Sequence, residues 1–236
     1  MQNRHLALVT GGNRGIGLET AKALARNGLA ILIGSRNLDD GLEAVRQLEG
    51  DGHGAVELDV TNSDQVQRAV AEADSRGGLD VLVNNAAIYL TPPAGKGDRT
   101  ALTTELAVAH RTFEVNVWAP LRLCQLVMPG MVERGYGRVV NVSSGYGAYA
   151  AQDGGGPSAY RLSKLALNGL TRQLAAEAGS GVLVNAVDPG WVQTRMGGSG
   201  ASRAPETAGA EIAWAAMLPD GGPSGQFFFA REPRAW

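Results

Sequence analysis

The chain has 236 residues, of which 44% are hydrophobic and 19% are charged, and its formal net charge at pH 7 is −2. These values are typical of a globular protein, and they argue against nucleic acid or an anionic membrane as a partner. The first residues lack a long apolar run, and no run reaches the roughly 18 residues of a membrane helix, so we expect a cytoplasmic protein.

Strand-like runs alternate with amphipathic helical stretches along the chain. The strand-like runs are 5–10, 30–35, 54–59, 79–84, 137–142, 181–187 and 225–230. The helical stretches are 17–27, 38–50, 62–78, one or two helices within 103–134, and 157–179. Several strand-like runs are apolar almost throughout, which is typical of strands covered on both faces. This order predicts an α/β fold over residues 1–236: one doubly wound Rossmann domain with about seven parallel strands and helices on both faces.

Three irregular stretches rich in Gly, Pro and Ser follow the fourth, fifth and sixth predicted strands, at 89–100, 145–159 and 194–206. In an open parallel sheet, ligands bind outside the carboxyl ends of the strands. We therefore expect the three loops to surround one site and to determine its substrate specificity. The candidate substrate contacts on loops at this site are Tyr146, Tyr149 and Trp191.

A glycine-rich turn follows the first predicted strand and opens the first predicted helix. The segment VTGGNRGIG spans residues 9–17 and contains Gly11, Gly15 and Gly17. Glycines in this context allow a tight turn and a close approach of backbone N–H groups to a pyrophosphate. No Gly-Lys-Ser/Thr sequence follows, which disfavours NTP hydrolysis. The turn therefore predicts dinucleotide binding, and the other candidate contacts within it are Asn13, Arg14 and Ile16.

The end of the second predicted strand indicates which dinucleotide is bound. An acidic residue there would accept a ribose 2′-OH, whereas an arginine would bind a 2′-phosphate. This chain has Ser35, Arg36 and Asn37 at that point, and Arg14 supplies a second cation from the glycine turn. Taken alone, Arg36 is better explained as a solvated loop charge. Together the two arginines favour NADP(H) over NAD(H).

The segment SAYRLSKLA, residues 158–166, places Tyr160 and Lys164 four residues apart on a predicted helix. Residues at this spacing meet on a helix surface. A cation within about 4–6 Å of a tyrosine favours the tyrosinate and lowers the pKa of the hydroxyl. The pair is therefore a candidate proton donor with its tuning charge, although by itself the spacing can arise by chance.

Further motifs stand at or near the ends of predicted strands, and one lies in the helical stretch 103–134. They are LDV at 58–60, NNAA at 84–87, FEVNVWAP at 113–120, RVVNVSSGYG at 138–147 and DPGWVQT at 188–194. In this order, and together with the glycine turn and YRLSK, they resemble the short-chain dehydrogenase/reductase family over nearly the whole chain. Within that family they are similar to the NADPH-dependent carbonyl reductases.

The resemblance assigns a role to individual residues. It implies that Asp59 contacts the adenine amino group, that Pro189 and Gly190 pack on the nicotinamide, and that Thr194 reaches its carboxamide. The other cofactor contacts it implies are Val60, Asn85, Ala86, Ala87 and Val192. It also implies a catalytic set of Asn116, Ser144, Tyr160 and Lys164, in which Ser144 matches the family serine better than Ser143 does.

This set predicts reduction of a ketone or aldehyde with NADPH. Tyr160 would donate the proton, Ser144 would bind the substrate oxygen, and Asn116 would hold a water that links Lys164 to solvent. One alternative is an NADP-linked alcohol or hydroxysteroid dehydrogenase that acts oxidatively, and another is a non-catalytic nucleotide sensor.

The remaining signals concern metals, compartment and assembly. Three scattered histidines and a single cysteine, Cys124, argue against a zinc site, exclude an internal disulfide and fit a reducing compartment. The long helices near 112–134 and 157–179 carry apolar residues on more than one face, more than one packing surface requires. We therefore expect a homodimer or homotetramer.

Overall fold

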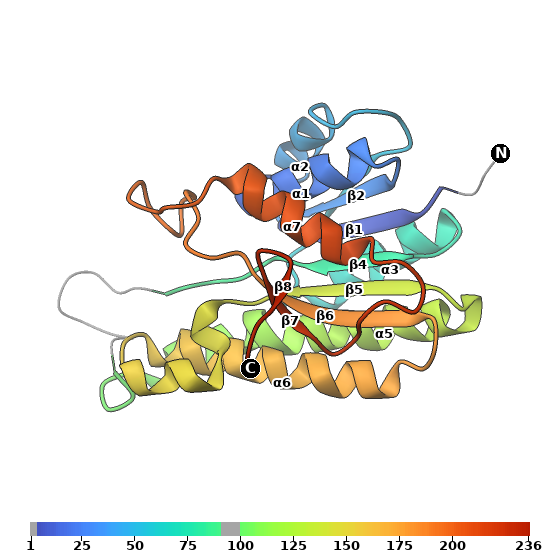
Figure 1. The fold of residues 1–236 in the computed structure, drawn as a ribbon. Coiled ribbons are helices and arrows are strands. Elements are labelled where there is room, and N and C mark those ends of the chain that lie inside the picture. The colour runs from blue at the N-terminus through green and yellow to red at the C-terminus, as the bar shows by residue number, and fades with distance from the viewer. Residues whose placement is uncertain (1–3, 91–99) are drawn as a thin grey trace.

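Residues 4–90 and 100–236 are described by the structure, a computed structural model, and their strands form one eight-stranded sheet (Figure 1). The strand order is β3-β2-β1-β4-β5-β6-β7-β8, and every neighbouring pair is parallel except β7 and β8. The strands are β1 (Leu6–Thr10), β2 (Ala30–Ser35), β3 (Gly54–Glu57), β4 (Val81–Asn84), β5 (Gly137–Val142), β6 (Val182–Asp188), β7 (Phe227–Phe229) and β8 (Glu232–Pro233). The order reverses direction between β1 and β4, as in a doubly wound fold.

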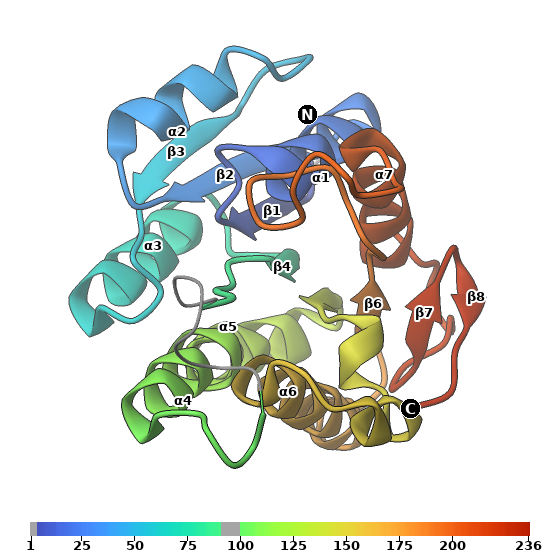
Figure 2. The same cartoon turned by 90° about the vertical axis from the view of Figure 1, so that its left-hand side faces the viewer.

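Helices cover both faces of this sheet (Figure 2). On one side lie α1 (Gly15–Arg26), α2 (Leu38–Val45) and α7 (Pro205–Ala216). On the other side lie α3 (Ser63–Ser75), α4 (Leu106–Phe113), α5 (Ala119–Arg134) and α6 (Ser158–Glu177). A π-helical turn, η1 (Glu114–Trp118), joins α4 to α5, and two 3₁₀ turns, η2 (Gly145–Gly147) and η3 (Tyr149–Gly154), follow β5.

The strands are apolar throughout because each face packs against helices. Val9, Ile33 and Val83 belong to the buried cluster beneath α1 and α7. Their neighbours Leu8, Leu32 and Leu82 belong to a separate cluster beneath α3, α5 and α6. Successive side chains of a strand point to opposite faces, so two apolar surfaces need a continuous apolar run. This confirms the predicted doubly wound α/β class.

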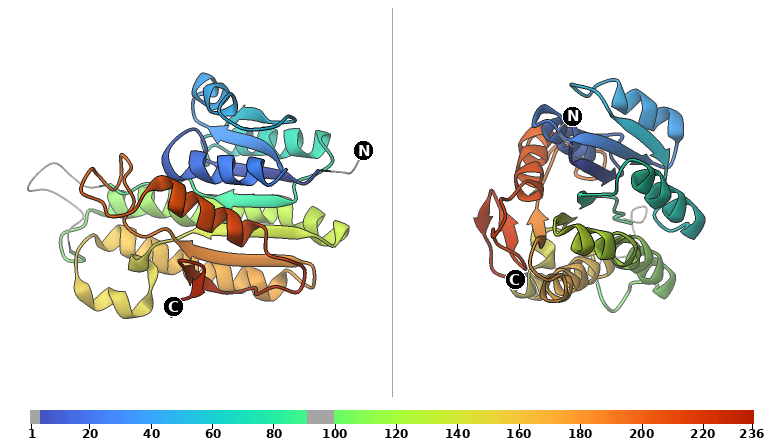
Figure 3. Two further views of the ribbon diagram at one scale, coloured as in Figure 1. Left: turned by 45° about the horizontal axis from the view of Figure 1, so that its top comes forward. Right: turned by 90° about the vertical axis from the view of Figure 1, so that its right-hand side faces the viewer.

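Two C-terminal elements were not predicted. Helix α7 (Pro205–Ala216) is rich in alanine and buried along most of its length, so its sequence lacks an amphipathic period. The last two residues of the expected loop 194–206 belong to this helix. Strand β8 (Glu232–Pro233) is only two residues long and antiparallel, so the sheet has eight strands rather than about seven parallel ones. Figure 3 shows the β7–β8 hairpin beyond β6 at the edge of the sheet.

Several predicted elements are shorter than expected, among them one helix and one strand near the glycine-turn end of the sheet. Helix α2 ends at Val45 rather than near residue 50, and β3 ends at Glu57 rather than at residue 59. The backbone turns away after β3, where the N–H of Leu58 still donates to Ser35 and the next residue, Asp59, faces a cavity. Strand β3 therefore ends two residues earlier than predicted, at the point where the chain begins to line the cavity.

Candidate active site

A cavity of about 1180 Å³ opens where β1, β4, β5 and β6 end, on the side that faces the viewer in Figure 2. Most of the predicted site residues line it: Gly11, Asn13, Arg14, Gly15, Ile16, Gly17, Arg36, Asp59, Val60, Asn85, Ala86, Ala87, Ser144, Tyr146, Tyr160, Lys164, Pro189, Gly190, Trp191, Val192 and Thr194. Ser35, Asn37, Asn116 and Tyr149 do not belong to its lining. The structure thus brings the glycine turn to the same cavity as Ser144, Tyr160 and Lys164.

The glycine turn forms one end of the cavity. Gly11 and Gly15 have φ angles of +62° and +53°, a region that favours glycine. A Cβ at Gly17 would lie 2.4 Å from the carbonyl oxygen of Gly11, so no larger residue fits there. Helix α1 begins at Gly15, has no acidic residue in its first turn, and receives no side-chain cap from Arg14. Its first N–H groups are therefore suited to a phosphate.

Arginines surround the same end. Arg36 follows β2 and is exposed, and Arg111 on α4 also reaches the cavity, which sequence reasoning missed. Burial disfavours the charged form of Asp59, but two hydrogen bonds from Thr61 and the charges of Arg111 and Arg36 outweigh it and lower the pKa of this carboxyl. Asp59 is therefore ionised at neutral pH, and its Oδ1 accepts from the Thr61 N–H at 2.9 Å.

Two of the predicted cofactor residues serve the local structure instead. Ser35 is buried at the end of β2. Asn37 caps α2, because its Oδ1 accepts from the N–H of Asp40 at 3.1 Å. Arg36 is the member of this trio whose side chain reaches the cavity.

The other end of the cavity holds Tyr160 and Lys164, one turn apart on α6. Lys164 Nζ lies 5.7 Å from the centre of the Tyr160 ring and donates to the carbonyl oxygen of Val142 at 2.8 Å. Ser144 hydrogen-bonds to the Tyr160 side chain. The neighbouring Ser143 donates to Asn168 Oδ1 at 2.6 Å. The geometry therefore favours Ser144 over Ser143 as the residue that acts with Tyr160.

Burial determines the ionisation of this pair. It lowers the pKa of Lys164 to about 7. Burial also raises the pKa of Tyr160. The hydrogen bond to Ser144 opposes this rise, whereas electrostatic interactions with Asp188, Tyr89 and Tyr146 add to it. The pKa of Tyr160 thus moves opposite to the predicted direction. A lysine that is only partly protonated at pH 7 and is bonded to a carbonyl does not offset the desolvation of the phenol.

Asn116 lies behind the cavity on the π-helical turn η1 and is buried. Its Oδ1 accepts from the Ile88 N–H at 2.9 Å, and its Nδ2 donates to the Ile88 carbonyl and to Ser163 Oγ, both at 3.0 Å. The side chain therefore ties the segment after β4 to α6, next to Lys164. Its role as a water holder stays a prediction.

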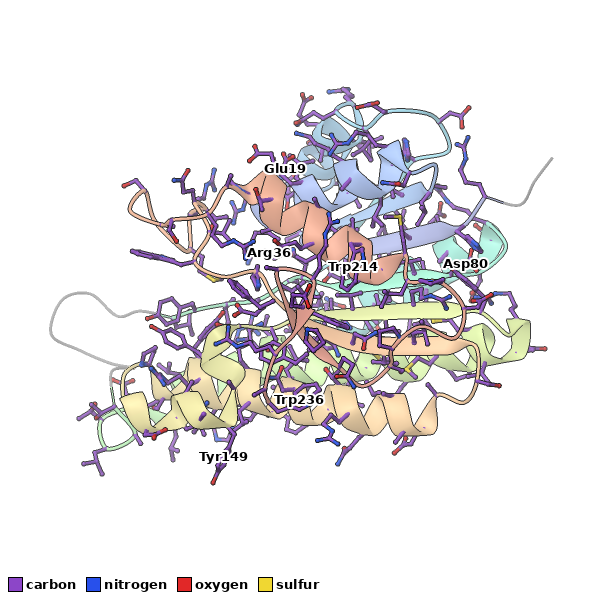
Figure 4. The ribbon with its side chains drawn as sticks, viewed as in Figure 1. Glu19, Arg36, Asp80, Tyr149, Trp214 and Trp236 are labelled. Carbon is purple, nitrogen blue, oxygen red and sulfur yellow. The ribbon has the colours of Figure 1, made fainter. Side chains whose placement is uncertain are left out.

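Aromatic side chains surround Tyr160. The rings of Tyr89 and Tyr146 meet the Tyr160 ring edge-on, with centroids 4.9 Å and 6.5 Å away. Trp191 lines the cavity, whereas Tyr149 is 76% exposed and projects at the outer edge of the molecule (Figure 4). Of the expected loop 89–100, residues 91–99 lie outside the described part of the chain.

The C-terminal segment also reaches the cavity, which the sequence did not indicate. Phe229 at the end of β7 and Arg234 after β8 both belong to the lining.

Within residues 4–90 and 100–236, no group of three or more His, Cys, Asp or Glu side chains is arranged to hold a metal ion. None of the helices in those two ranges is both long and apolar enough to span a membrane.

The chain is similar to known proteins over most of its length. The sequence profile of the family described as short chain dehydrogenase matches residues 5–204. The oxidoreductase UcpA of Salmonella typhimurium is 36% identical over 223 residues, covering 90% of this chain and 80% of the relative. The 3-oxoacyl-(acyl-carrier-protein) reductase FabG of Vibrio cholerae is 34% identical over 193 residues, covering 81% and 75%. The NADPH-bound carbonyl reductase from chicken fatty liver superimposes with a TM-score of 0.84 at 26% identity, covering 99% of each chain.

Proposed function

Because the chain belongs to the short-chain dehydrogenase family, whose members act on CH–OH or C=O groups, we propose that it reduces a ketone or aldehyde with NADPH. One observation carries the proposal: a single cavity joins a glycine turn with two arginines to a half-buried Tyr160 that is hydrogen-bonded to Ser144. The cavity volume of about 1180 Å³ leaves room for a dinucleotide and for a small carbonyl compound at the Tyr160 end.

The choice of NADP(H) rests on Arg14 and Arg36. Both side chains are exposed at the glycine-turn end of the cavity, and the end of β2 carries no acid that would bind a free ribose 2′-OH. A guanidinium can bind a 2′-phosphate through two parallel hydrogen bonds. The chicken carbonyl reductase, which is described as NADPH-bound, supports this choice by analogy.

Pro189, Gly190 and Thr194 line the cavity where they would hold the nicotinamide of NADPH, which would supply the hydride for the carbonyl carbon. Tyr160 donates its hydroxyl proton to the carbonyl oxygen as that oxygen becomes an alkoxide, so the product is the alcohol. The raised pKa of Tyr160 keeps the proton on the phenol until this step. Ser144 holds the substrate oxygen within reach of Tyr160. Lys164 returns a proton to Tyr160, and a water held near Asn116 links Lys164 to solvent.

The test compares NADPH consumption by wild type, Tyr160→Phe and Tyr149→Phe with a panel of ketones and aldehydes. Tyr149 is the matched control, since it is exposed and lies outside the cavity lining. We expect Tyr160→Phe to lose about 10²–10⁴-fold in kcat, the usual contribution of a positioned acid. NADPH binding, followed by tryptophan fluorescence, should stay within about twofold of wild type, because the hydroxyl is not a binding group for the phosphates.

Three outcomes would count against the proposal. Unchanged turnover in Tyr160→Phe would mean that another group donates the proton. Faster turnover with NADH than with NADPH would remove the role given to Arg36. NADPH binding without turnover of any carbonyl or alcohol by wild type would favour the sensor alternative.

We also propose that the protein is a homodimer or homotetramer. Trp118 on η1 is 48% exposed, and Leu126 on α5 and Leu162 on α6 are exposed as well. Large apolar side chains on neighbouring helices favour a helix-to-helix interface between copies. Light scattering at micromolar concentration should give a dimer or tetramer mass, and a monomer mass would refute the proposal.

A further inference from the structure

A buried carboxylate lies at the Tyr160 end of the cavity. Asp188 is the last residue of β6, and its side chain is 3% exposed. Its Oδ1 accepts from the Gly190 N–H at 2.9 Å, and its Oδ2 accepts from Arg234 Nη1 at 2.5 Å. One oxygen therefore holds the Pro189–Gly190 turn, and the other is neutralised by a cation from the C-terminus.

Arg234 is itself held in place. Its backbone N–H donates to the carbonyl oxygen of Phe227 at 2.7 Å. Its guanidinium lies 5.8 Å and 5.6 Å from the ring centres of Phe227 and Phe229. The side chain is 37% exposed and lines the cavity. The β7–β8 hairpin thus carries this cation to the end of β6, 46 residues back along the chain.

Gly145 allows the close approach of this ion pair to the serine segment. A Cβ on Gly145 would lie 3.0 Å from Asp188 Oδ2 and 3.2 Å from Arg234 Nη2, tighter than most real contacts. Gly145 directly follows Ser144, the hydrogen-bond partner of Tyr160. The pair therefore lies beside the segment that carries Ser144.

The charge of Asp188 acts on Tyr160. A carboxylate near a phenol disfavours the tyrosinate, and the Asp188 charge contributes to the raised pKa of Tyr160. The other ionisable groups around the pair are Tyr160 and Lys164 on α6, Tyr146 on η2, Tyr89 after β4, and the ion pair of Arg203 with Glu211 between β6 and α7. A carboxylate buried at this depth is itself unstable as an ion without a partner.

We propose that Arg234 is a positioning residue for proton transfer: it pairs with Asp188, keeps this carboxylate oriented on Gly190, and offsets the negative charge that opposes ionisation of Tyr160. The C-terminal segment, outside residues 5–204, is therefore part of the active site. This inference rests on the proposed function of Tyr160 as the proton donor.

The experiment follows the ionisation of Tyr160 in four proteins: wild type, Arg234→Gln, Asp188→Asn and the double variant. With NADP⁺ and the alcohol product, kcat rises with pH and levels off above the apparent pKa of the base. We expect Arg234→Gln to raise this pKa by about half to one unit, Asp188→Asn to lower it by a similar amount, and the double variant to return it close to wild type.

A control and a second readout separate this inference from the proposed function. Arg231→Gln removes a cation from the same hairpin but outside the cavity lining, so it should leave the profile unchanged. The ultraviolet absorbance of the tyrosinate, taken as the difference from matching Tyr160→Phe variants, follows the same proton without turnover. If wild type turns over no substrate, the proposed function fails and the absorbance titration still decides the role of Arg234.

Two results would overturn the inference. An unchanged pKa in Arg234→Gln would mean that Arg234 does not offset the charge of Asp188 at Tyr160. An equal upward shift in Arg234→Gln and in the double variant would mean that Arg234 acts without Asp188. The inference is supported if the pKa of Tyr160 shifts in opposite directions in the two single variants and returns to the wild-type value in the double variant. A general loosening of the fold would not shift this pKa in opposite directions.

Discussion

The two ends of the cavity differ in how they use charge. At the glycine-turn end, Arg14 and Arg36 are exposed to solvent. At the other end, Lys164 and Asp188 are buried and Tyr160 is half-buried, and the side chains of Lys164 and Asp188 bond to the Val142 carbonyl and to Arg234. Exposed charges are screened by salt and shift pKa values little, whereas buried charges shift them strongly. The first end is therefore suited to selecting a cofactor, and the second to controlling a proton.

The largest expected effect tests the buried end. Lys164→Met should lower kcat about 10²–10³-fold, because the route that returns a proton to Tyr160 is lost. Steady-state kinetics over several pH values measures the loss. Lys22→Met is the matched control, since Lys22 pairs with Glu19 on the outer side of α1, and it should stay within about twofold of wild type. If Lys164→Met kept most of its kcat, the buried lysine would be structural only.

A second prediction distinguishes the roles of Ser143 and Ser144, two adjacent serines at the Tyr160 end of the cavity. Ser144→Ala should lose about 30–100-fold in kcat, because the substrate oxygen and the Tyr160 hydroxyl lose a hydrogen-bond partner. Ser143→Ala should keep its kcat but lose about 1–2 kcal/mol of unfolding free energy, since Asn168 Oδ1 then loses its bond in a buried site. Kinetics and urea unfolding of both variants separate the roles. Equal kinetic losses would show that the serines share one role.

The sequence predicted well what depends on local patterns. The glycine turn, the strand periods and the four-residue spacing of Tyr160 and Lys164 are each set within a short segment, and the structure reproduces them. The direct pairing of β1 with β4 was not predicted, but it is consistent with the predicted doubly wound class, in which the strand order reverses at such a point.

Features that depend on distant segments were not predictable. Arg234 meets Asp188 only because a two-residue strand turns the C-terminus back, and neither a period nor a turn motif marks that strand. Arg111 looks like an ordinary surface charge on a helix until α4 is placed beside Asp59. The predicted fall in the pKa of Tyr160 was wrong. Burial raises this pKa and has the largest effect on it, and burial is a property of the folded chain.

A third prediction addresses the exposed end. Arg36→Ala should raise the KM for NADPH about tenfold and leave kcat unchanged, as expected for the loss of one charge-assisted bond to the 2′-phosphate. The effect should shrink as salt is added, whereas the loss in Lys164→Met should not. Arg46→Ala, which removes an exposed cation from the end of α2, is the control. A fall in kcat for Arg36→Ala would contradict the assignment of separate roles to the two ends.

The smallest effect concerns stability rather than rate. The pKa of Lys164 is about 7 in the folded protein and near its ordinary value of 10.5 in the unfolded chain. Between these values the unfolded chain binds a proton that the folded protein does not, so folding becomes more favourable as pH rises. Below pH 7 both states are protonated, and Lys164 adds no slope.

The unfolding free energy of wild type should therefore rise relative to Lys164→Met by about 1 kcal/mol per pH unit between pH 7.5 and 9.5, a range that follows from the lysine pKa values. Urea unfolding of both proteins at several pH values measures the difference, in which the contributions of other groups cancel. Arg36→Ala should run parallel to wild type, because an arginine stays protonated throughout this range. If the unfolding free energies of wild type and Lys164→Met changed in parallel with pH, Lys164 would remain charged in the folded state. The two ends of the cavity would then not differ in how burial affects their charges.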